Sequence, residues 1–225
     1  ALRSPHIPGK LTRDIIRKGM PLLINEFLWS TGMAFLSQCY STRGLEVVAA
    51  FNIATTISML SNVVFLSLGN AVGILMGQML GAGLPRAEIQ DSNRKLIAFA
   101  VVTGGAFGGL MALFSHIFPG IYNTTDDVRS LATSFIWIIS IMLPIASFTF
   151  ATYFTLRAGG KALITFLFDS CFLWVGPVFL SVILSRFTEI PILPLYAICH
   201  LVDVVRCVAG VILLKKVKWM ARLTE

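Results

Sequence analysis

The chain has 225 residues, of which 56% are hydrophobic and only 13% are charged. This balance excludes an ordinary soluble domain of the same length and indicates a protein with several membrane-spanning helices. The net charge is +7, but the basic residues lie in the short segments between apolar stretches and at the two ends. We therefore expect no nucleic-acid partner.

Six apolar stretches follow one another along the chain. A helix of about 20 residues crosses the roughly 30 Å hydrocarbon core of a bilayer, and each stretch is long enough to do so. Short connections rich in glycine and proline separate them. The sequence predicts an all-α polytopic membrane protein with a basic segment at 1–18, a six-helix transmembrane lobe at 19–217 and a tail at 218–225. The predicted spans are 19–41, 46–80, 92–119, 127–157, 161–185 and 192–215.

The distribution of basic residues supports an even number of spans. Six spans leave fourteen of the eighteen Lys and Arg residues on one side of the membrane and three on the other, with Arg206 inside a span. Because positive charge concentrates in cytoplasmic loops, we expect both ends of the chain to lie in the cytoplasm.

Three acidic residues, Glu26, Asp169 and Asp203, lie inside the predicted spans. A carboxylate in hydrocarbon is costly, and it is rare unless it faces a water-filled cavity, an ion path or a partner. At 1.5 Å per residue, all three lie roughly 10–15 Å from the cytoplasmic surface. Carboxylates at one depth can line one cavity, so the sequence favours a transporter.

The three acids differ in their basic neighbours. Asp203 and Arg206 are three residues apart on one helix face, so we expect them to form an ion pair. Glu26 and Asp169 have no basic neighbour in sequence, and an unpaired carboxyl there takes up a proton or binds a cation. We predict that Glu26 and Asp169 couple transport to H⁺ or Na⁺, with Na⁺ at these two residues as the metal-site alternative and no further cofactor.

Amide side chains can complete such a site. Asn25 is next to Glu26, and Asn52 and Asn70 lie along the second span. We predict that they support the site together with Asp203 and Arg206. The alternative for each amide is a hydrogen bond between helices without a role in transport.

Glycine recurs every four residues in the second span, at Gly69, Gly73, Gly77 and Gly81. Small residues at this spacing form a smooth helix face that another helix can approach closely. This face is predicted to be a packing surface, with a contact that slides during transport as the alternative.

Sequence signatures of enzymes are absent. The sequence contains no His-Glu-x-x-His, no Gly-x-Ser-x-Gly and no glycine-rich phosphate loop. Each of these motifs places a metal, a nucleophile or a phosphate in a defined geometry. We predict that the protein is not an enzyme and that transport draws on an ion gradient.

Several segments together resemble the C-terminal half of a transporter of the MATE (multidrug and toxic compound extrusion) family. Most of the chain takes part in this resemblance. The matching segments are Pro21 to Ser30, Val48 to Ile53, Gly69 to Gly83, Leu156 to Gly160, Asp169 with Trp174 and Pro177, and Asp203 and Arg206 with Lys218-Trp219.

The resemblance implies a twelve-helix exporter of two six-helix lobes in the plasma (inner) membrane of a bacterium. Such exporters alternate between outward-open and inward-open states and exchange cationic or amphipathic drugs for Na⁺ or H⁺. The implied partners are the lipid bilayer, small-molecule drugs and an N-terminal six-helix lobe, from the same chain or a second copy. Glu26 lies about one turn nearer the proline than the sodium-coupled pattern, and Pro144 to Thr155 contains no acid, so the coupling ion stays open.

Two other functions fit an all-α membrane protein. One is a related flippase for lipid-linked saccharides, whose anionic cargo favours a cavity rich in arginine and lysine. Arg206 is the only basic residue deep in a predicted span, which disfavours this cargo. The other is a membrane module that transports nothing and needs no acids in its spans.

Overall fold

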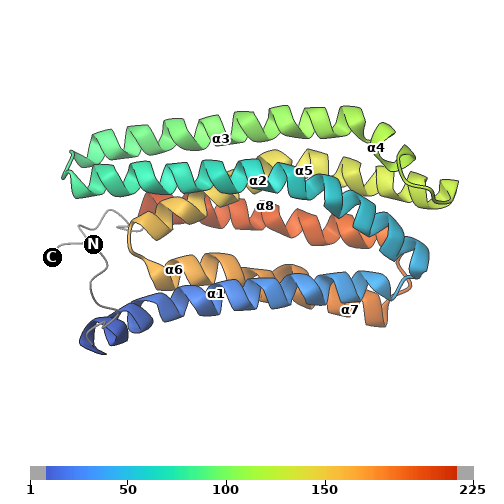
Figure 1. Ribbon diagram of the computed structural model, residues 1–225, viewed down its shortest axis with the longest axis horizontal. Coiled ribbons are helices and arrows are strands. Elements are labelled where there is room, and N and C mark those ends of the chain that lie inside the picture. The colour runs from blue at the N-terminus through green and yellow to red at the C-terminus, as the bar shows by residue number, and fades with distance from the viewer. Residues whose placement is uncertain (1–8, 217–225) are drawn as a thin grey trace, which may run out of the picture.

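The computed structural model describes residues 9–216, and all the regular structure within them is helical (Figure 1). The predicted all-α fold is confirmed. The predicted fifth span is one continuous helix built from four consecutive segments. The elements are α1 (Gly9–Ser41), α2 (Leu45–Gly81), α3 (Arg86–Phe114), α4 (Ile117–Gly120), α5 (Asp126–Ala158), α6 (Ala162–Phe166), η1 (Leu167–Cys171), η2 (Trp174–Val178), α7 (Phe179–Phe187) and α8 (Ile192–Lys216).

The first helix differs from its predicted limits. The sequence places a basic segment at 1–18 before the first span, whereas α1 already begins at Gly9. Helical backbone therefore continues about two and a half turns before the apolar stretch, because nothing between Gly9 and Pro21 interrupts it. The remainder of this segment and the tail predicted at 218–225, with Lys218-Trp219, lie outside the described residues.

Five helices of the described part are long and apolar enough to cross a membrane. They are α2, α3, α5, the composite helix over Leu163–Phe187, and α8. α1 is more polar, with Asn25, Glu26 and Ser30 near its middle. It nevertheless runs alongside the composite helix as the sixth long helix (Figure 1).

The long helices fall into two groups. α5 is the centre of the first group and packs against α2 and α3. α1 and the composite helix α6–η1–η2–α7 form the second group, and α8 contacts both (Figure 1). At one end, an aromatic cluster joins the groups, where Tyr196 packs edge-on against Tyr40 at 5.3 Å and Phe135 at 4.8 Å between ring centroids.

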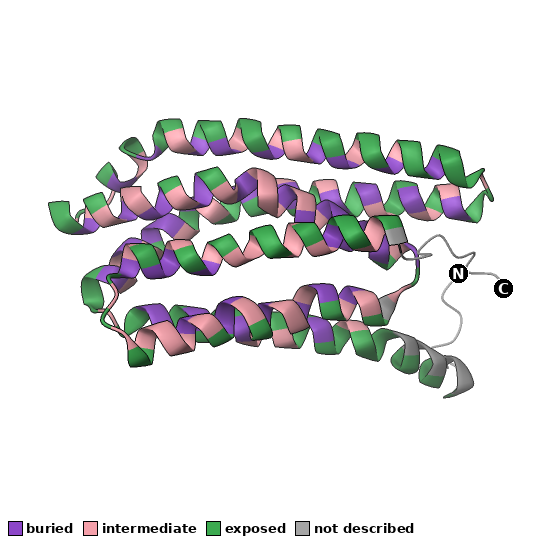
Figure 2. Ribbon diagram, turned by 180° about the vertical axis from the view of Figure 1, so that it is seen from behind, coloured by how far each residue is buried: buried purple, intermediate pink, exposed green. Residues whose placement is uncertain are grey.

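Apolar side chains cover the outside of the molecule as well as its interior. Exposed residues follow the outer faces of the helices, and buried residues lie where helices meet (Figure 2). Large apolar side chains such as Leu60, Val102 and Leu113 are exposed. An apolar exterior of this kind is what a helix bundle surrounded by lipid requires.

Glycine permits the closest helix contacts, although not at every predicted position. Gly69 faces the ring of Phe154 on α5, whereas Gly77 and Gly81 have no atom within 4 Å of an added Cβ. Close packing is therefore confirmed for only part of the α2 glycine face. On α3, a Cβ at Gly108 would lie 2.5 Å from the Ser140 carbonyl oxygen of α5.

We expect Gly108→Ala to destabilise the protein by about 1–3 kcal/mol, because an added methyl group in a tight helix contact forces the backbones apart. Gly109→Ala is the matched control, since nothing lies within 4 Å of its Cβ. It should stay within about 0.5 kcal/mol of the parent. Thermal unfolding of the purified protein in detergent measures both, and equal effects would contradict the close α3–α5 contact.

Candidate functional site: a polar junction of four helices

The composite helix widens twice into π-helical turns, at η1 and η2. Pro177 lies in η2 and lacks the N–H that a regular helix uses, which accounts for the second turn. η1 contains no proline. Its Asp169 and Ser170 instead bind other helices through their side chains. Single π turns within α-helices are frequent at functional sites.

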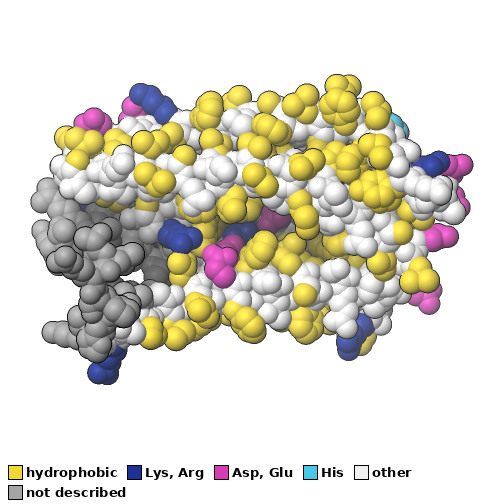
Figure 3. Space-filling model, viewed as in Figure 1, with side chains coloured by type: hydrophobic (Ala, Val, Ile, Leu, Met, Phe, Trp, Pro, Cys, Tyr) yellow, Lys and Arg dark blue, Asp and Glu magenta, His cyan; other side chains and the backbone are white. Residues whose placement is uncertain are grey.

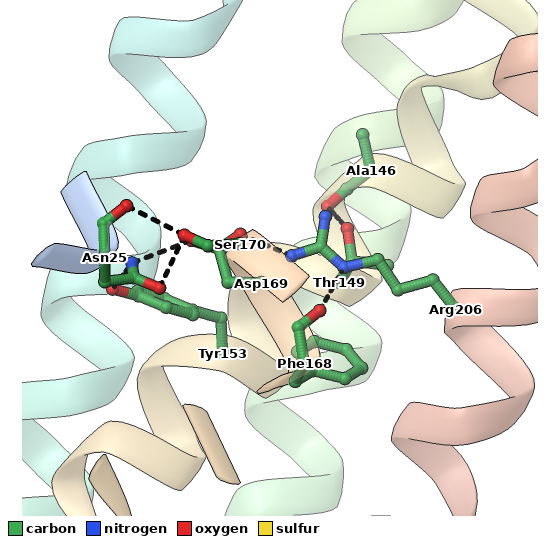
Figure 4. Close-up of polar contacts among 8 residues, drawn as sticks. All are labelled: Asn25, Ala146, Thr149, Tyr153, Phe168, Asp169, Ser170 and Arg206. Atoms are coloured by element: carbon green, nitrogen blue, oxygen red, sulfur yellow. Dashed lines mark hydrogen bonds and ion pairs between the residues drawn. The ribbon is translucent and has the colours of Figure 1, made fainter. Parts of the chain in front are cut away.

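Arg206 of α8 holds the η1 turn by two hydrogen bonds (Figure 4). Its Nη2 donates to Asp169 Oδ1 at 2.5 Å, and its Nε donates to the Phe168 carbonyl oxygen at 2.9 Å. The guanidinium also lies over the Phe168 ring, 4.9 Å from its centroid. Both charged side chains are 15% exposed. The pair is thus largely removed from solvent, where an ion pair needs good geometry to be tolerated.

Asn25 joins α1 to the same turn and to α5 (Figure 4). Its Nδ2 donates to Asp169 Oδ2 at 3.0 Å and to the Tyr153 hydroxyl oxygen at 3.3 Å. The Ser170 hydroxyl lies 2.7 Å from the Asn25 carbonyl oxygen and 2.8 Å from Asn25 Oδ1, and it donates toward both. Asn25 is only 3% exposed. Its amide is therefore fully used by contacts that fix α1 against η1.

These contacts correct two predictions from the sequence. Asp169 was expected to lack a basic partner, but Arg206 pairs with it from another helix. The expected pair between Asp203 and Arg206 is also wrong. The nearest basic group to Asp203 is His200, with 4.0 Å between Asp203 Oδ2 and His200 Nδ1. Arg206 favours η1 because this turn presents a carboxylate and a carbonyl oxygen together.

Glu26 is placed differently from Asp169. Its side chain is exposed, and it makes no hydrogen bond or ion pair within residues 9–216. Glu26 and Asp169 both interact electrostatically with the Tyr153 hydroxyl. The two acids that the sequence singled out thus both lie within electrostatic range of one hydroxyl, as does the Arg157 guanidinium. Figure 3 shows a hollow between α2 and α1, with acidic and basic side chains within it.

The other predicted members do not join this network. Asn52 and Asn70 are exposed on α2, and their side chains form no hydrogen bond in the part of the chain that the structure describes. Their supporting role stays a prediction. Among the described residues, no three His, Cys, Asp or Glu side chains gather as a metal site.

Sequence reasoning missed Tyr153 and Ser170. Neither is charged, and Ser170 is fully buried. Adjacency to Asp169 is the one signal that could have pointed to Ser170. Tyr153 lies sixteen positions before Asp169 on another helix, so only the packing of α5 against η1 brings its hydroxyl to the site.

A comparison with protein families decides what kind of protein carries this site. The family model MatE matches residues 21–189, well over half of the chain. The chain belongs to the MATE family. The predicted resemblance is confirmed, and membership places the chain among membrane-embedded transporters rather than enzymes.

Named relatives of this MATE chain are multidrug resistance proteins. It is 29% identical over 147 residues to the probable multidrug resistance protein NorM of Idiomarina loihiensis, covering 64% of this chain and 31% of that protein. It is 30% identical over 125 residues to the multidrug resistance protein MdtK of Edwardsiella ictaluri, covering 54% and 26%. The matched part thus spans less than a third of each relative.

The fold is that of solved MATE structures. The outward-facing conformation of a multidrug resistance MATE family transporter of the MOP superfamily matches with a TM-score of 0.80 and 19% sequence identity. The match covers 96% of this chain and 48% of that transporter. The chain therefore spans about half the length of that transporter.

We expect Arg206→Gln to destabilise the protein by about 3 kcal/mol, because it leaves the Asp169 carboxylate largely buried without a counter-charge. Lys95→Gln is the control, since the Lys95–Asp91 pair on α3 is exposed and its loss should cost less than about 1 kcal/mol. Thermal unfolding in detergent compares the two variants. Adding Asp169→Asn to Arg206→Gln should recover part of the loss, and a purely additive result would contradict the pairing.

Proposed function

We propose that this chain is one lobe of a cation-coupled multidrug antiporter that exports cationic or amphipathic compounds by alternating access. The observation that carries the proposal is the uncompensated Glu26 carboxylate beside the Asp169 site, within helices of a MATE fold. The names of the relatives support the substrate class. Since the chain spans about half of a solved family member, we propose that an N-terminal six-helix lobe completes the cavity, from the same chain or a second copy.

Glu26 is the first residue to which we assign ion coupling. An exposed acid with no basic partner among the described residues attracts both a coupling cation and a cationic drug. If the protein binds one more weakly in the presence of the other, each lowers the protein's affinity for the other by the same factor. Alternating access then follows when the two ligands favour different conformations.

Asp169 can take a cation only when Arg206 leaves it. Asp203 offers the guanidinium a second carboxylate, three residues away on the same face of α8. We propose that H⁺ or Na⁺ at Asp169 accompanies a turn of Arg206 toward Asp203, and that Asn25 follows by exchanging its contact with Asp169 Oδ2. The two arrangements keep Arg206 paired in both states.

The ion itself is H⁺ or Na⁺. A proton needs only a carboxylate. Na⁺ would need further oxygens beside Glu26 and Asp169, which the carbonyl and hydroxyl oxygens of Asn25, Tyr153 and Ser170 or bound water can supply. We propose no other cofactor.

The orientation follows from charge. Basic residues gather at the start of α1, between α2 and α3, between α5 and α6, and at the end of α8. These segments lie at one end of the molecule in Figure 1. Because cytoplasmic segments carry an excess of Lys and Arg, we propose that this end faces the cytoplasm of a bacterium and that the protein lies in its plasma membrane.

Dye efflux tests the proposed function. The complete gene is expressed in bacteria that lack their own efflux pumps, and ethidium export is followed while sodium and pH are varied independently. Glu26→Gln should slow export at least about tenfold, a change of 1.4 kcal/mol, because the coupling carboxylate is lost. Glu46→Gln, an exposed acid at the start of α2, should export normally at equal expression.

Equal export by Glu26→Gln and Glu46→Gln would overturn the assignment of Glu26. Absence of export by the parent protein for every dye tested would overturn multidrug transport itself, and the flippase and non-transporting module would then take its place. Whether a sodium gradient or a pH gradient drives export identifies the coupling ion as Na⁺ or H⁺.

We further expect Asp203→Asn to slow ethidium export while changing the thermal unfolding temperature little, because it removes the second partner of Arg206 but not the Asp169 pair. Purified protein in liposomes with an imposed gradient gives the export rate. Export at the parental rate would contradict the exchange of Arg206 between the two acids.

A further inference from the structure

A groove of about 1050 Å³ lies between the first half of α1 and α6. Ile16, Met20 and Ile24 of α1 form one wall, and Leu163 and Phe166 of α6 form the other. The three α1 residues recur at intervals of four, so they share one face of that helix. The groove exists because α1 begins at Gly9 and not at the predicted residue 19. The additional turns of α1 place this face beside α6.

The groove wall is apolar and open. Ile16, Met20 and Ile24 are 52%, 44% and 43% exposed, and Leu163 is 70% exposed. An exposed apolar strip of this kind marks a surface that another apolar group covers. The volume is at the upper end of the range of roughly 300–1,000 Å³ found for small-molecule sites, which gives room for a long flexible ligand.

The mouth of the groove is basic. Arg13 and Arg17, one helical turn apart, are among its lining residues, and they are the charged residues among the side chains that the structure describes there. Arg13 precedes the apolar wall and Arg17 lies between Ile16 and Met20. Both are in the first part of α1, which is at the end of the molecule where the other basic segments gather (Figure 1). The groove thus runs from positive charge into apolar surface, the polarity of a lipid with an anionic head.

We propose that this groove binds an anionic membrane phospholipid, with its phosphate at Arg13 and Arg17 and an acyl chain along the wall from Ile16 to Ile24. The bidentate guanidinium group matches the geometry of a phosphate. Basic pockets between transmembrane helices bind anionic lipid headgroups. The site is separate from the Glu26 and Asp169 region, so it does not depend on the proposed function.

Retention of phosphatidylglycerol tests the site. The full-length protein is purified, stripped of lipid and exposed to mixed micelles with equal parts of phosphatidylglycerol and phosphatidylcholine, and bound lipid is counted by native mass spectrometry. The parent should retain phosphatidylglycerol in preference to phosphatidylcholine. Arg13→Gln with Arg17→Gln should lower that retention at least about tenfold.

Two further variants test whether lipid retention depends on this groove or only on the positive charge at this end of the molecule. Arg86→Gln with Arg94→Gln removes the same charge from the start of α3, at the same end of the molecule, and should retain the lipid. Leu163→Trp fills the groove without changing charge and should lower retention as the arginine variant does. Thermal unfolding of each variant confirms that it is folded.

Four outcomes of the lipid-retention experiment would overturn the proposal. They are equal loss in both arginine variants, equal retention of the two lipids by the parent, unchanged retention in Leu163→Trp, and displacement of the lipid by inorganic phosphate alone at millimolar concentration. A crosslink from Ile16→Cys to another lobe of the transporter would also overturn it, because the groove would then be an interface between lobes.

Discussion

Arg206 reaches from α8 to the η1 turn and neutralises Asp169, and this contact holds α8 against the group formed by α1 and the composite helix. Both carboxylate oxygens are used, one by Arg206 and the other by Asn25 of α1. A largely buried charge is tolerated only when its partner and its hydrogen bonds are all present. The pair therefore sets how α1, η1, α5 and α8 lie relative to one another.

The widened turn makes this arrangement possible. A regular helix satisfies its own carbonyl groups, and at the π turn the Phe168 carbonyl oxygen also accepts a hydrogen bond from Arg206 Nε. Inside a membrane, irregular backbone persists only where neighbouring helices satisfy the groups it frees. At η1 the Arg206 guanidinium binds both the Phe168 carbonyl oxygen and the Asp169 carboxylate. If Asp169 loses its charge, Arg206 is held less firmly, and its hydrogen bond to the backbone changes as well.

Glu26 and Asp169 share the Tyr153 hydroxyl as a neighbour but differ in electrostatic state. Arg206 pairs with Asp169, while Glu26 forms no ion pair within the described residues, although Arg157 also interacts with the Tyr153 hydroxyl. Two acids, Glu26 and Asp169, and two arginines, Arg157 and Arg206, thus lie in the region of this hydroxyl, and Glu26 is the exposed acid that a cation can reach. Asp169 contacts Arg206 of α8 and Asn25 of α1, so a cation that binds Asp169 changes contacts between helices. An ion-driven conformational change requires such a link between binding and packing.

The sequence by itself determined the helical membrane fold, because lipid forces each spanning segment to satisfy its own backbone hydrogen bonds and so makes apolar length a direct measure of a span. It also predicted a common depth for Glu26 and Asp169, since the helical rise converts position into depth. Only the tertiary structure decided that Arg206 pairs with Asp169 rather than Asp203, and that Tyr153 and Ser170 belong to the site. Those choices depend on how each helix is rotated and which helix lies beside it, and residue spacing along one helix contains neither quantity.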